Sequence, residues 1–333
     1  MLQSQPYPPA VDHDDSAIEL SVVVPMRNEE ESIGPLVERI CGALKGFGKP
    51  WELIIVDDGS TDATLANARK EFSREGLDLR IVELQRNFGQ AAGLQAGIDA
   101  ARGRLLATLD GDLQNDPYDI PGMIAVLEER QLDLLCGWRK DRHDGLVLRL
   151  IPSWIANALI RKVTGVRVHD YGCGLKLYRT RVLKQIRIMG DMHRFIPALI
   201  ASVAPTSRID EMVVTHNARR YGQSKYGLSR TFRVVLDLLS VAFFMSFRYR
   251  PGHFFGVIGL AFGTVSALIF LYLFFVKFLL GEDIGTRPLL IVAVMLFVAS
   301  VQMISTGILG EILARPDGET RNYFVRNIHV RDA

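Results

Sequence analysis

The chain has 333 residues, of which 39 are Lys or Arg and 37 are Asp or Glu, so its formal net charge is only +2. A nearly neutral chain lacks the strong basic field of a general nucleic-acid binder, so no nucleic-acid partner is expected. A hydrophobic fraction of 48% excludes a largely disordered protein. The three cysteines are widely spaced and form neither a zinc pattern nor a disulfide framework, which is typical of a reducing cytosol.

Two long apolar segments near the C-terminal end predict a membrane part behind a globular part. Phe254–Val276 and Pro288–Gly310 are each 23 residues long and contain no Asp, Glu, Lys or Arg. A helix of that length crosses about 30 Å of hydrocarbon, at about 1.5 Å per residue, and the short connection predicts a hairpin. A buried hairpin of a soluble protein is the alternative, which two such segments in tandem disfavour. At the inner end of the second span, Glu311 is expected to pair with Arg315.

The basic residues around the hairpin predict its orientation. They are concentrated before its first and after its second segment, whereas the connection offers only Lys277 and Arg287. Because basic residues favour the cytoplasmic side of a membrane, we expect a multi-pass protein whose globular part lies in the cytoplasm. The flanking arginines are Arg230, Arg233, Arg248, Arg250, Arg315, Arg321, Arg326 and Arg331.

The globular part alternates between strand patterns and helix patterns. Ile18–Pro25 is a short β-branched run, and apolar residues then recur at helical spacing from Ile33 to Leu44. Further strands are expected at Trp51–Val56, Leu79–Leu84, Leu105–Leu109, Leu132–Cys136, Leu175–Tyr178 and Ile209–His216. Further helices are expected at Thr61–Arg74, Gln90–Ala101, Asp119–Arg130, Leu146–Thr164 and Phe195–Val203. This alternation predicts an α/β fold with a mostly parallel sheet between helices.

The domain organisation follows from these patterns. The Pro- and Asp-rich start lacks the basic and apolar stretches of a secretory signal. Ser229–Phe247 carries polar residues on one helical face, which favours an interfacial helix over an ordinary core helix. We expect a disordered tail over 1–17, a cytosolic globular domain over 18–228, an interfacial helix over 229–250, two transmembrane helices within 251–313, and a cytosolic C-terminal tail over 314–333.

Acidic residues follow two of the predicted strands directly. Asp57 and Asp58 come after one strand, and Asp110 and Asp112, separated by Gly111, come after another. Because carboxyl ends of parallel strands meet at one edge of a sheet, we expect both clusters to converge on one crevice and to share a cation. Two carboxylates at i,i+2 suit a hard cation such as Mg²⁺ or Mn²⁺. The chain has no P-loop lysine pattern and no GxGxxG after its first strand, which argues against an ATPase and a nicotinamide enzyme.

Several motifs occur in an order that resembles a known family. VVPMRNEE (23–30), IIVDDGSTD (54–62), RNFGQAAGLQAGIDAARG (86–103) and TLDGDLQNDP (108–117) together are similar to glycosyltransferase family 2. GWR (137–139), HDYGCGLKLY (169–178), RYGQSKYG (220–227) and the two spans resemble its polyisoprenyl-phosphate branch, which includes dolichol-phosphate mannose synthases and undecaprenyl-phosphate glucosyl- and formamido-arabinose transferases.

The resemblance implies a fold, a reaction and partners. It implies the glycosyltransferase A fold and inverting transfer of a sugar from a nucleotide-diphosphate sugar, with UDP favoured, to a membrane polyprenyl phosphate. The product would serve cell-envelope glycan synthesis or lipid modification. It also implies a bacterial inner-membrane location and a homo-oligomer, often a tetramer. The sugar itself is specified by no motif.

The resemblance also implies residue roles. Pro25 and Glu29 match the nucleoside-contacting loop, and Asp57 and Asp58 match the base- and ribose-binding pair. A metal and diphosphate motif is matched by Asp110, Asp112 and Gln114. Groups around the acceptor phosphate are matched by Arg139, Arg149, Ser153, Arg220, Ser224 and Lys225. For the arginines, a solvated helix face or membrane-surface contact is the alternative.

The role of Asp170 is left open between two possibilities, whereas the neighbouring His169 is interpreted as structural. A hydroxyl acceptor needs a base because it must lose its proton during attack. A phosphomonoester has a second pKa of about 6 and is already ionised near neutral pH. Asp170 is therefore either a base or a group that orients Lys176 or an arginine.

Other functions leave different signatures in the sequence. A glycosyltransferase with a diacylglycerol or sphingoid hydroxyl as acceptor would use Asp170 as its base. A processive polysaccharide synthase would need a Gln-x-x-Arg-Trp segment and more spans, and neither is present. A non-catalytic membrane scaffold would not need the acidic loops, and a pore or flippase built from hairpins has little support.

Overall fold

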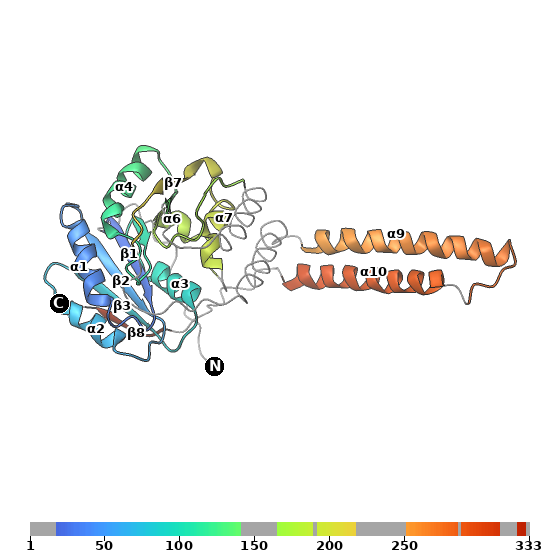
Figure 1. Cartoon of the computed structure of the whole chain (residues 1–333), viewed down its shortest axis with the longest axis horizontal. Helices are drawn as coiled ribbons and strands as arrows, with labels where there is room; N and C mark the ends of the chain where they lie inside the picture. The colour runs from blue at the N-terminus through green and yellow to red at the C-terminus, as the bar shows by residue number, and fades with distance from the viewer. Residues whose placement is uncertain are drawn as a thin grey trace. The chain divides into compact units, whose positions relative to one another are not determined.

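The computed structural model describes residues 18–140, 165–188, 192–217, 251–285 and 288–313, together with the backbone of 325–330. Contacts divide the chain into two compact units, Met1–Ala242 with Arg321–Ala333 and Phe243–Thr320. Figure 1 shows the sheet and its helices in the first unit and two long helices in the second. The helices expected over 146–164 and 229–247, and the tail over 1–17, lie outside the described residues.

The first unit is built on one eight-stranded sheet with the order β7-β5-β6-β4-β1-β2-β3-β8. Four central strands are parallel, β5 and β7 are parallel to each other, β6 is antiparallel to β4 and β5, and β8 is antiparallel to β3. The mostly parallel sheet predicted from the sequence is confirmed. The strands are β1 (Leu20–Met26), β2 (Trp51–Asp57), β3 (Asp78–Leu84), β4 (Leu105–Thr108), β5 (Leu134–Trp138), β6 (Lys176–Arg179), β7 (Ile209–Val213) and β8 (Val325–Val330).

Helices cover both faces of this sheet because successive strand residues point to opposite sides. Val22 and Val24 of β1 belong to a buried cluster that includes residues of α1, α2 and α4. Val23 faces the other way, where α3 packs so closely that a side chain at Gly97 would meet it. The helices are α1 (Ile33–Leu44), α2 (Thr64–Lys70), α3 (Gln90–Ala100), α4 (Ile120–Glu129), α6 (Thr180–Leu183) and α7 (Ile196–Ile200), with short 3₁₀ turns at Glu71–Ser73, Pro117–Asp119, Met192–Phe195 and Thr206–Arg208.

The C-terminal segment differs from the expected tail. Val325–Val330 forms β8 and pairs with β3, in a ladder whose register shifts between Glu83 and Leu84. This strand lies at the edge of the sheet and comes after the helical hairpin in the chain, outside the strand–helix alternation of the N-terminal part. The chain therefore leaves the first unit, forms the helical hairpin and returns to the sheet.

A buried carboxylate ties the strands together at their amino-terminal ends, opposite the acidic loops. Glu52 is fully buried at the start of β2 and accepts a hydrogen bond of 2.6 Å from the Ser21 hydroxyl of β1. Its second oxygen accepts from Nε and Nη2 of Arg102 at 2.9 and 2.7 Å. This contact joins β1 and β2 to the turn before β4.

Replacing Glu52 with Ala is expected to destabilise the first unit by about 3 kcal/mol, because it leaves the Ser21 hydroxyl buried without its acceptor and removes a charge-assisted pair. The measurement is the thermal unfolding of the purified protein. Lys49→Ala is the control, since Lys49 forms an exposed ion pair with Glu19 at 2.9 Å and should cost less than about 1 kcal/mol. Equal effects of the two changes would contradict this role of Glu52.

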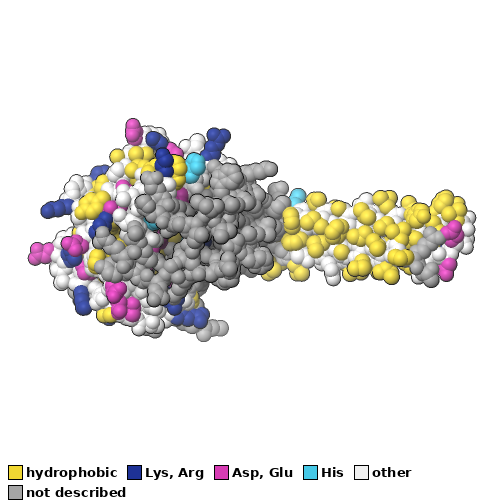
Figure 2. All heavy atoms as spheres, in the orientation of Figure 1, with side chains coloured by type: hydrophobic (Ala, Val, Ile, Leu, Met, Phe, Trp, Pro, Cys, Tyr) yellow, Lys and Arg dark blue, Asp and Glu magenta, His cyan; other side chains and the backbone are white. Residues whose placement is uncertain are grey.

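The second unit is a hairpin of two apolar helices, α9 (Pro251–Phe278) and α10 (Pro288–Leu313), each with a mean hydropathy of 2.3 over its most apolar window. Both are candidate membrane spans. Figure 2 shows hydrophobic side chains over the hairpin surface, as expected for helices surrounded by lipid. Ser300 and Ser266 donate across the pair to the carbonyls of Gly259 and Ala293, at 2.7 and 2.8 Å.

Glu311 has a partner that the sequence did not suggest. Its Oε2 accepts a hydrogen bond of 3.1 Å from the backbone N–H of Gly252, in the first turn of α9. A carboxylate at that position satisfies a helix N-terminus, which otherwise leaves backbone donors unpaired. The pair expected with Arg315 involves a residue outside the described ranges.

Candidate active site

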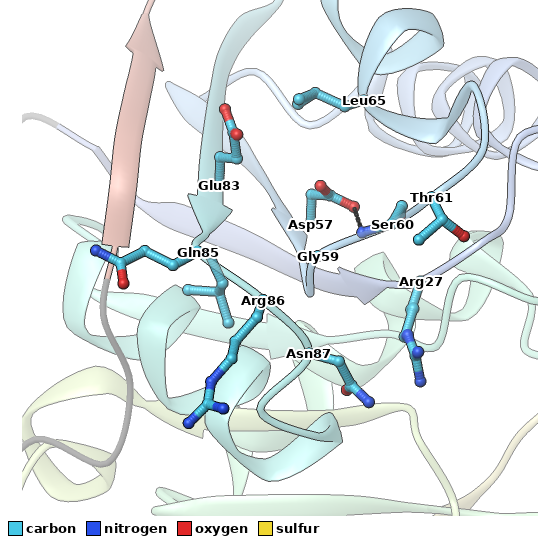
Figure 3. Close-up of a pocket in the computed structure, with 11 residues that line it drawn as sticks. Arg27, Asp57, Gly59, Ser60, Thr61, Leu65, Glu83, Gln85, Arg86 and Asn87 are labelled. Atoms are coloured by element: carbon cyan, nitrogen blue, oxygen red, sulfur yellow. Dashed lines mark hydrogen bonds between the residues drawn. The ribbon is translucent and has the colours of Figure 1, made fainter.

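The loop after β2 borders a pocket of about 490 Å³ at the carboxyl edge of the sheet. Asp57 contributes its buried side chain, and its Oδ1 accepts a hydrogen bond of 3.2 Å from the Ser60 N–H. Figure 3 shows Asp57 and Glu83 on adjacent strands, with Arg27 and Arg86 among the other lining residues. Burial raises the pKa of Asp57, and the nearby Glu83 and Asp58 charges raise it further. The pocket thus combines buried acceptors with cationic side chains.

Asp58 has a different position from its neighbour. Its Oδ1 and Oδ2 accept hydrogen bonds from the N–H groups of Phe88 and Gly89, at 2.7 and 2.9 Å. Gly89 has a φ of 94°, which glycine adopts without steric cost, and α3 begins at the next residue. Asp58 therefore fixes the turn that leads into α3. Gln90, the first residue of α3, donates from Nε2 to Asp110 Oδ1 at 2.9 Å and so links the two acidic loops.

The second acidic loop follows β4. Burial raises the pKa of Asp110, and the charge of Asp112 raises it further, whereas Lys176, Arg139 and Gln90 lower it. Asp112 Oδ1 accepts from the N–H of Gln114 at 3.2 Å, and Leu113 between them has a positive φ of 61°. A left-handed conformation is costly for leucine, and such strain is concentrated at functional sites.

The sharing of one cation by both acidic loops stays a prediction, and the strand order does not favour it. In the described ranges, no three or more Asp, Glu, His or Cys side chains are grouped as a ready metal site. In the sheet, β1 lies between β2 and β4. Neighbouring strands are about 4.8 Å apart, so the loops after β2 and β4 start about 10 Å apart.

The second acidic loop alone has suitable donors for a divalent cation. Asp110 and Asp112 place two carboxylates at i,i+2, and Gln114 adds an amide oxygen. Hard cations such as Mg²⁺ and Mn²⁺ prefer oxygen ligands, and they relieve the repulsion between two close carboxylates. Burial is the larger cause of the raised Asp110 pKa, and the charge of the nearby Asp112 raises it further. These residues therefore fit a metal bound together with donor oxygens.

Gly172 and Gly174 of the HDYGCGLKLY motif lie in the segment before β6, next to side chains of the candidate site. The Asp110 carboxylate packs directly against Gly174, so that an added Cβ would overlap it. Thr108 Oγ1 donates to the Gly174 carbonyl at 2.9 Å and holds this backbone in place. Gly172 lies beside the Arg139 guanidinium, at 3.4 Å from the position of an added Cβ.

Gly174→Ala is expected to reduce turnover by about 100-fold with little loss of stability, because the methyl group must displace the Asp110 carboxylate. Gly46→Ala is the control, since its methyl group would have no neighbour within 4 Å. Steady-state rates and thermal unfolding of both variants provide the measurement. A Gly174→Ala enzyme as active as the Gly46→Ala enzyme would contradict this placement of Asp110.

Arg139 and Asp170 form a two-pronged ion pair next to the second acidic loop. Asp170 Oδ2 accepts from Arg139 Nε at 2.7 Å, and Oδ1 accepts from Nη2 at 3.1 Å. Oδ1 also accepts from the Gly172 N–H at 3.1 Å, and only 3% of Asp170 is exposed. Burial would lower the pKa of Arg139, but its bond to Asp170 outweighs this and raises the pKa. Both Asp170 oxygens are thus engaged in orienting a guanidinium.

The remaining predicted residues are only partly described. Pro25 lies in β1 next to Gly93 of α3, and Glu29 Oε2 accepts from the Ser32 hydroxyl at 3.2 Å. The backbone of Gln114 accepts from Asn217 N–H at 2.7 Å. His169 stacks on Trp138 and bonds Glu211. Five residues expected near the acceptor phosphate lie outside the described ranges: Arg149, Ser153, Arg220, Ser224 and Lys225.

Comparison with known proteins decides the family. The model of the family described as "Glycosyl transferase family 2" matches residues 21–187, which contain both acidic loops and the Arg139–Asp170 pair. The chain belongs to glycosyltransferase family 2. It is therefore a glycosyltransferase, as the order of its motifs predicted.

Relatives of this family 2 glycosyltransferase match it over nearly its whole length. A dodecaprenyl-phosphate galacturonate synthase of Rhizobium johnstonii is 65% identical over 94% of this chain and 93% of its own length. An undecaprenyl-phosphate 4-deoxy-4-formamido-L-arabinose transferase of Shewanella sediminis is 34% identical over 96% of each chain. Both alignments are too long to stop at the globular unit, so they include the helical hairpin.

Solved structures show the same fold in the globular unit. Glucosyl-3-phosphoglycerate synthase from Mycobacterium tuberculosis, in complex with phosphoglyceric acid, superposes with a TM-score of 0.53 and 23% identity, over 68% of this chain and 80% of that chain. The complex of the same enzyme with Mn²⁺, UDP-glucose and phosphoglyceric acid has a TM-score of 0.52 and 21% identity, with the same coverage. The expected glycosyltransferase A fold is confirmed.

Proposed function

We propose that this glycosyltransferase transfers a sugar from a UDP-sugar to the phosphate of a membrane polyprenyl phosphate, with inversion at the anomeric carbon. The observation that carries this proposal is the engagement of both Asp170 oxygens by Arg139 and Gly172. A carboxylate held in this way orients a guanidinium and is poorly suited to accept a proton from a hydroxyl. An ionised phosphate needs no base, and a guanidinium is the side chain best suited to bind it.

The relatives support the same acceptor and suggest the sugar. The two relatives are named for different sugars, but both are named for a polyprenyl phosphate. At 65% identity, the galacturonate synthase is far more similar to this chain than the formamido-arabinose transferase at 34%. Galacturonate is therefore the sugar that we assign to the donor.

Each group of site residues has its own role in the proposed reaction. The pocket at Asp57 takes the nucleoside of the donor, and Asp58 holds the turn that delivers Gln90 to Asp110. Asp110, Asp112 and Gln114 would hold Mg²⁺ or Mn²⁺, which supplies a positive charge to the diphosphate when bound. Arg139, oriented by Asp170, holds the acceptor phosphate in line with the anomeric carbon. One phosphate oxygen then attacks this carbon from the side opposite the diphosphate, which inverts its configuration.

The membrane hairpin explains how a lipid acceptor reaches the enzyme. The acceptor phosphate cannot leave the membrane surface, so an enzyme anchored by α9 and α10 encounters it in two dimensions. The arginines that flank the hairpin in the sequence support a location in the bacterial inner membrane with the catalytic unit in the cytoplasm. A homo-oligomer, by analogy with the family, remains a prediction.

A donor screen with the full-length protein tests this function. The purified enzyme in phospholipid vesicles is given undecaprenyl phosphate, Mn²⁺ and one radiolabelled donor at a time. We expect label in the lipid fraction with UDP-galacturonate, and little with UDP-glucose or GDP-mannose. Absence of lipid product with every donor would refute the proposal, and a product from another donor would change only the sugar.

A further inference from the structure

A buried lysine next to Asp110 has no role in the function described above. Lys176 is the first residue of β6, where its backbone pairs with Thr108 of β4 and Cys136 of β5. The residue is only 4% exposed, and its ammonium group donates to the carbonyl of Cys173. Because Asp110 follows β4 closely and packs against Gly174, Lys176 lies at the catalytic edge of the sheet.

The surroundings of Lys176 do not neutralise its charge directly. In the part of the chain that the structure describes, its hydrogen bond is to a neutral carbonyl, and no Asp or Glu forms an ion pair with it. Its charge acts on the nearby Asp110 carboxylate. Burying an ammonium group costs several kcal/mol, whereas the next two residues, Leu177 and Tyr178, fill the same strand without charge. A purely structural position would not need the cation.

Arg139, another described cation at this edge, is paired with Asp170 and is assigned above to the acceptor phosphate. Arg139 forms its two-pronged pair with Asp170, so that pair has little net charge before substrate binds. Asp110 and Asp112 add two negative charges, which a divalent cation balances. The diphosphate of the donor then brings further negative charge to the same place. Among the residues that the structure describes here, Lys176 is the buried positive charge that forms no ion pair.

We infer that Lys176 is a further catalytic residue, whose fixed ammonium group binds the diphosphate of the donor and stabilises the departing nucleoside diphosphate. This inference rests on the proposed function. The bond between the anomeric carbon and the diphosphate oxygen breaks, and its electron pair stays on that oxygen. A phosphate oxygen of the acceptor supplies the pair for the new bond to the same carbon. The diphosphate gains one negative charge and the acceptor phosphate loses one, so a fixed cation beside the diphosphate favours the transition state.

The test compares nucleotide binding and turnover in Lys176→Met and the wild-type protein, both full-length and in detergent. Calorimetry with Mn²⁺ present gives the affinities for UDP and for an intact UDP-sugar. We expect UDP affinity to fall at least 10-fold, affinity for the UDP-sugar to fall less, and turnover to fall about 100-fold. Lys184→Met is the matched control, because Lys184 also donates to a backbone carbonyl, that of Ala101, and should leave these values unchanged.

Binding of Mn²⁺ alone separates this role from a merely structural one. Loss of a nearby positive charge should leave Mn²⁺ binding equal or tighter, whereas a disturbed Asp110 should weaken it. Unchanged UDP affinity, or Mn²⁺ affinity that falls as much as UDP affinity, would overturn the inference. Lys176→Gln, which can still donate to the Cys173 carbonyl, gives the same comparison if methionine prevents folding. Binding is measured without lipid, so a failure of transfer to polyprenyl phosphate would remain a separate result.

Discussion

Asp112→Asn is expected to lower turnover by about 1000-fold while leaving the fold intact. Asp112 is half-buried in the second acidic loop, and its Oδ1 accepts a hydrogen bond from the Gln114 backbone N–H, which an Asn oxygen can also accept. Loss of the charge removes half of the carboxylate pair that suits a divalent cation. The measurement is the rate of sugar transfer at saturating donor, together with Mn²⁺ affinity, which should fall in parallel.

Asp78→Asn is the matched control for this change. Asp78 lies at the opposite end of the sheet, where its half-exposed carboxylate pairs with Arg102 at 2.8 Å. Its variant should retain wild-type turnover and Mn²⁺ affinity. Full activity of Asp112→Asn in the presence of a chelator would contradict a metal role for this loop.

Asp170→Asn is expected to reduce turnover by about 100-fold and to leave the pH dependence of turnover unchanged. The amide can accept only on one side, so the two-pronged hold on Arg139 is lost and the acceptor phosphate is bound less rigidly. If Asp170 orients Arg139, the variant should show a raised KM for the lipid acceptor and the same shape of pH–rate profile as the wild type. Arg139→Lys should show a similar defect, since an ammonium group cannot form the same pair.

A different result would identify Asp170 as a general base. Removing a general base abolishes the acidic limb of the pH–rate profile and allows partial rescue by an added carboxylate such as formate. Rescue of Asp170→Asn by formate, with an unchanged KM for the acceptor, would therefore support a hydroxyl acceptor and contradict the orienting role.

The sequence predicted the central fold because its signals are local. The β-branched run at Ile18–Pro25 and the helical spacing from Ile33 to Leu44 correspond to β1 and α1 within a few residues. The two apolar segments correspond to α9 and α10. By contrast, β8 was not predicted, because its place is set by pairing with β3, a segment more than 240 residues earlier in the chain.

The candidate site was predicted in part for the same reason. Aspartates after buried strands are visible in the sequence, and Asp57 and Asp110 do lie at the carboxyl edge. Their separation by β1 depends on strand order, which no local pattern gives. Lys176 was named only as a group that Asp170 could orient, and Gly174 was missed because its importance comes from packing against Asp110. In the sequence, Lys176 is a single charged residue within a short apolar strand pattern, and this could have indicated a functional position.

Acceptor competition tests the central claim most directly. Vesicles that contain equal amounts of undecaprenyl phosphate and undecaprenol, the corresponding alcohol, are incubated with the full-length enzyme, Mn²⁺ and radiolabelled UDP-galacturonate. The account predicts that all of the lipid-bound label is in the sugar phosphodiester and none in the alcohol, because an ionised phosphate needs no base and Asp170 is engaged with Arg139. Label on undecaprenol, or on a phospholipid hydroxyl in place of the polyprenyl phosphate, would contradict it.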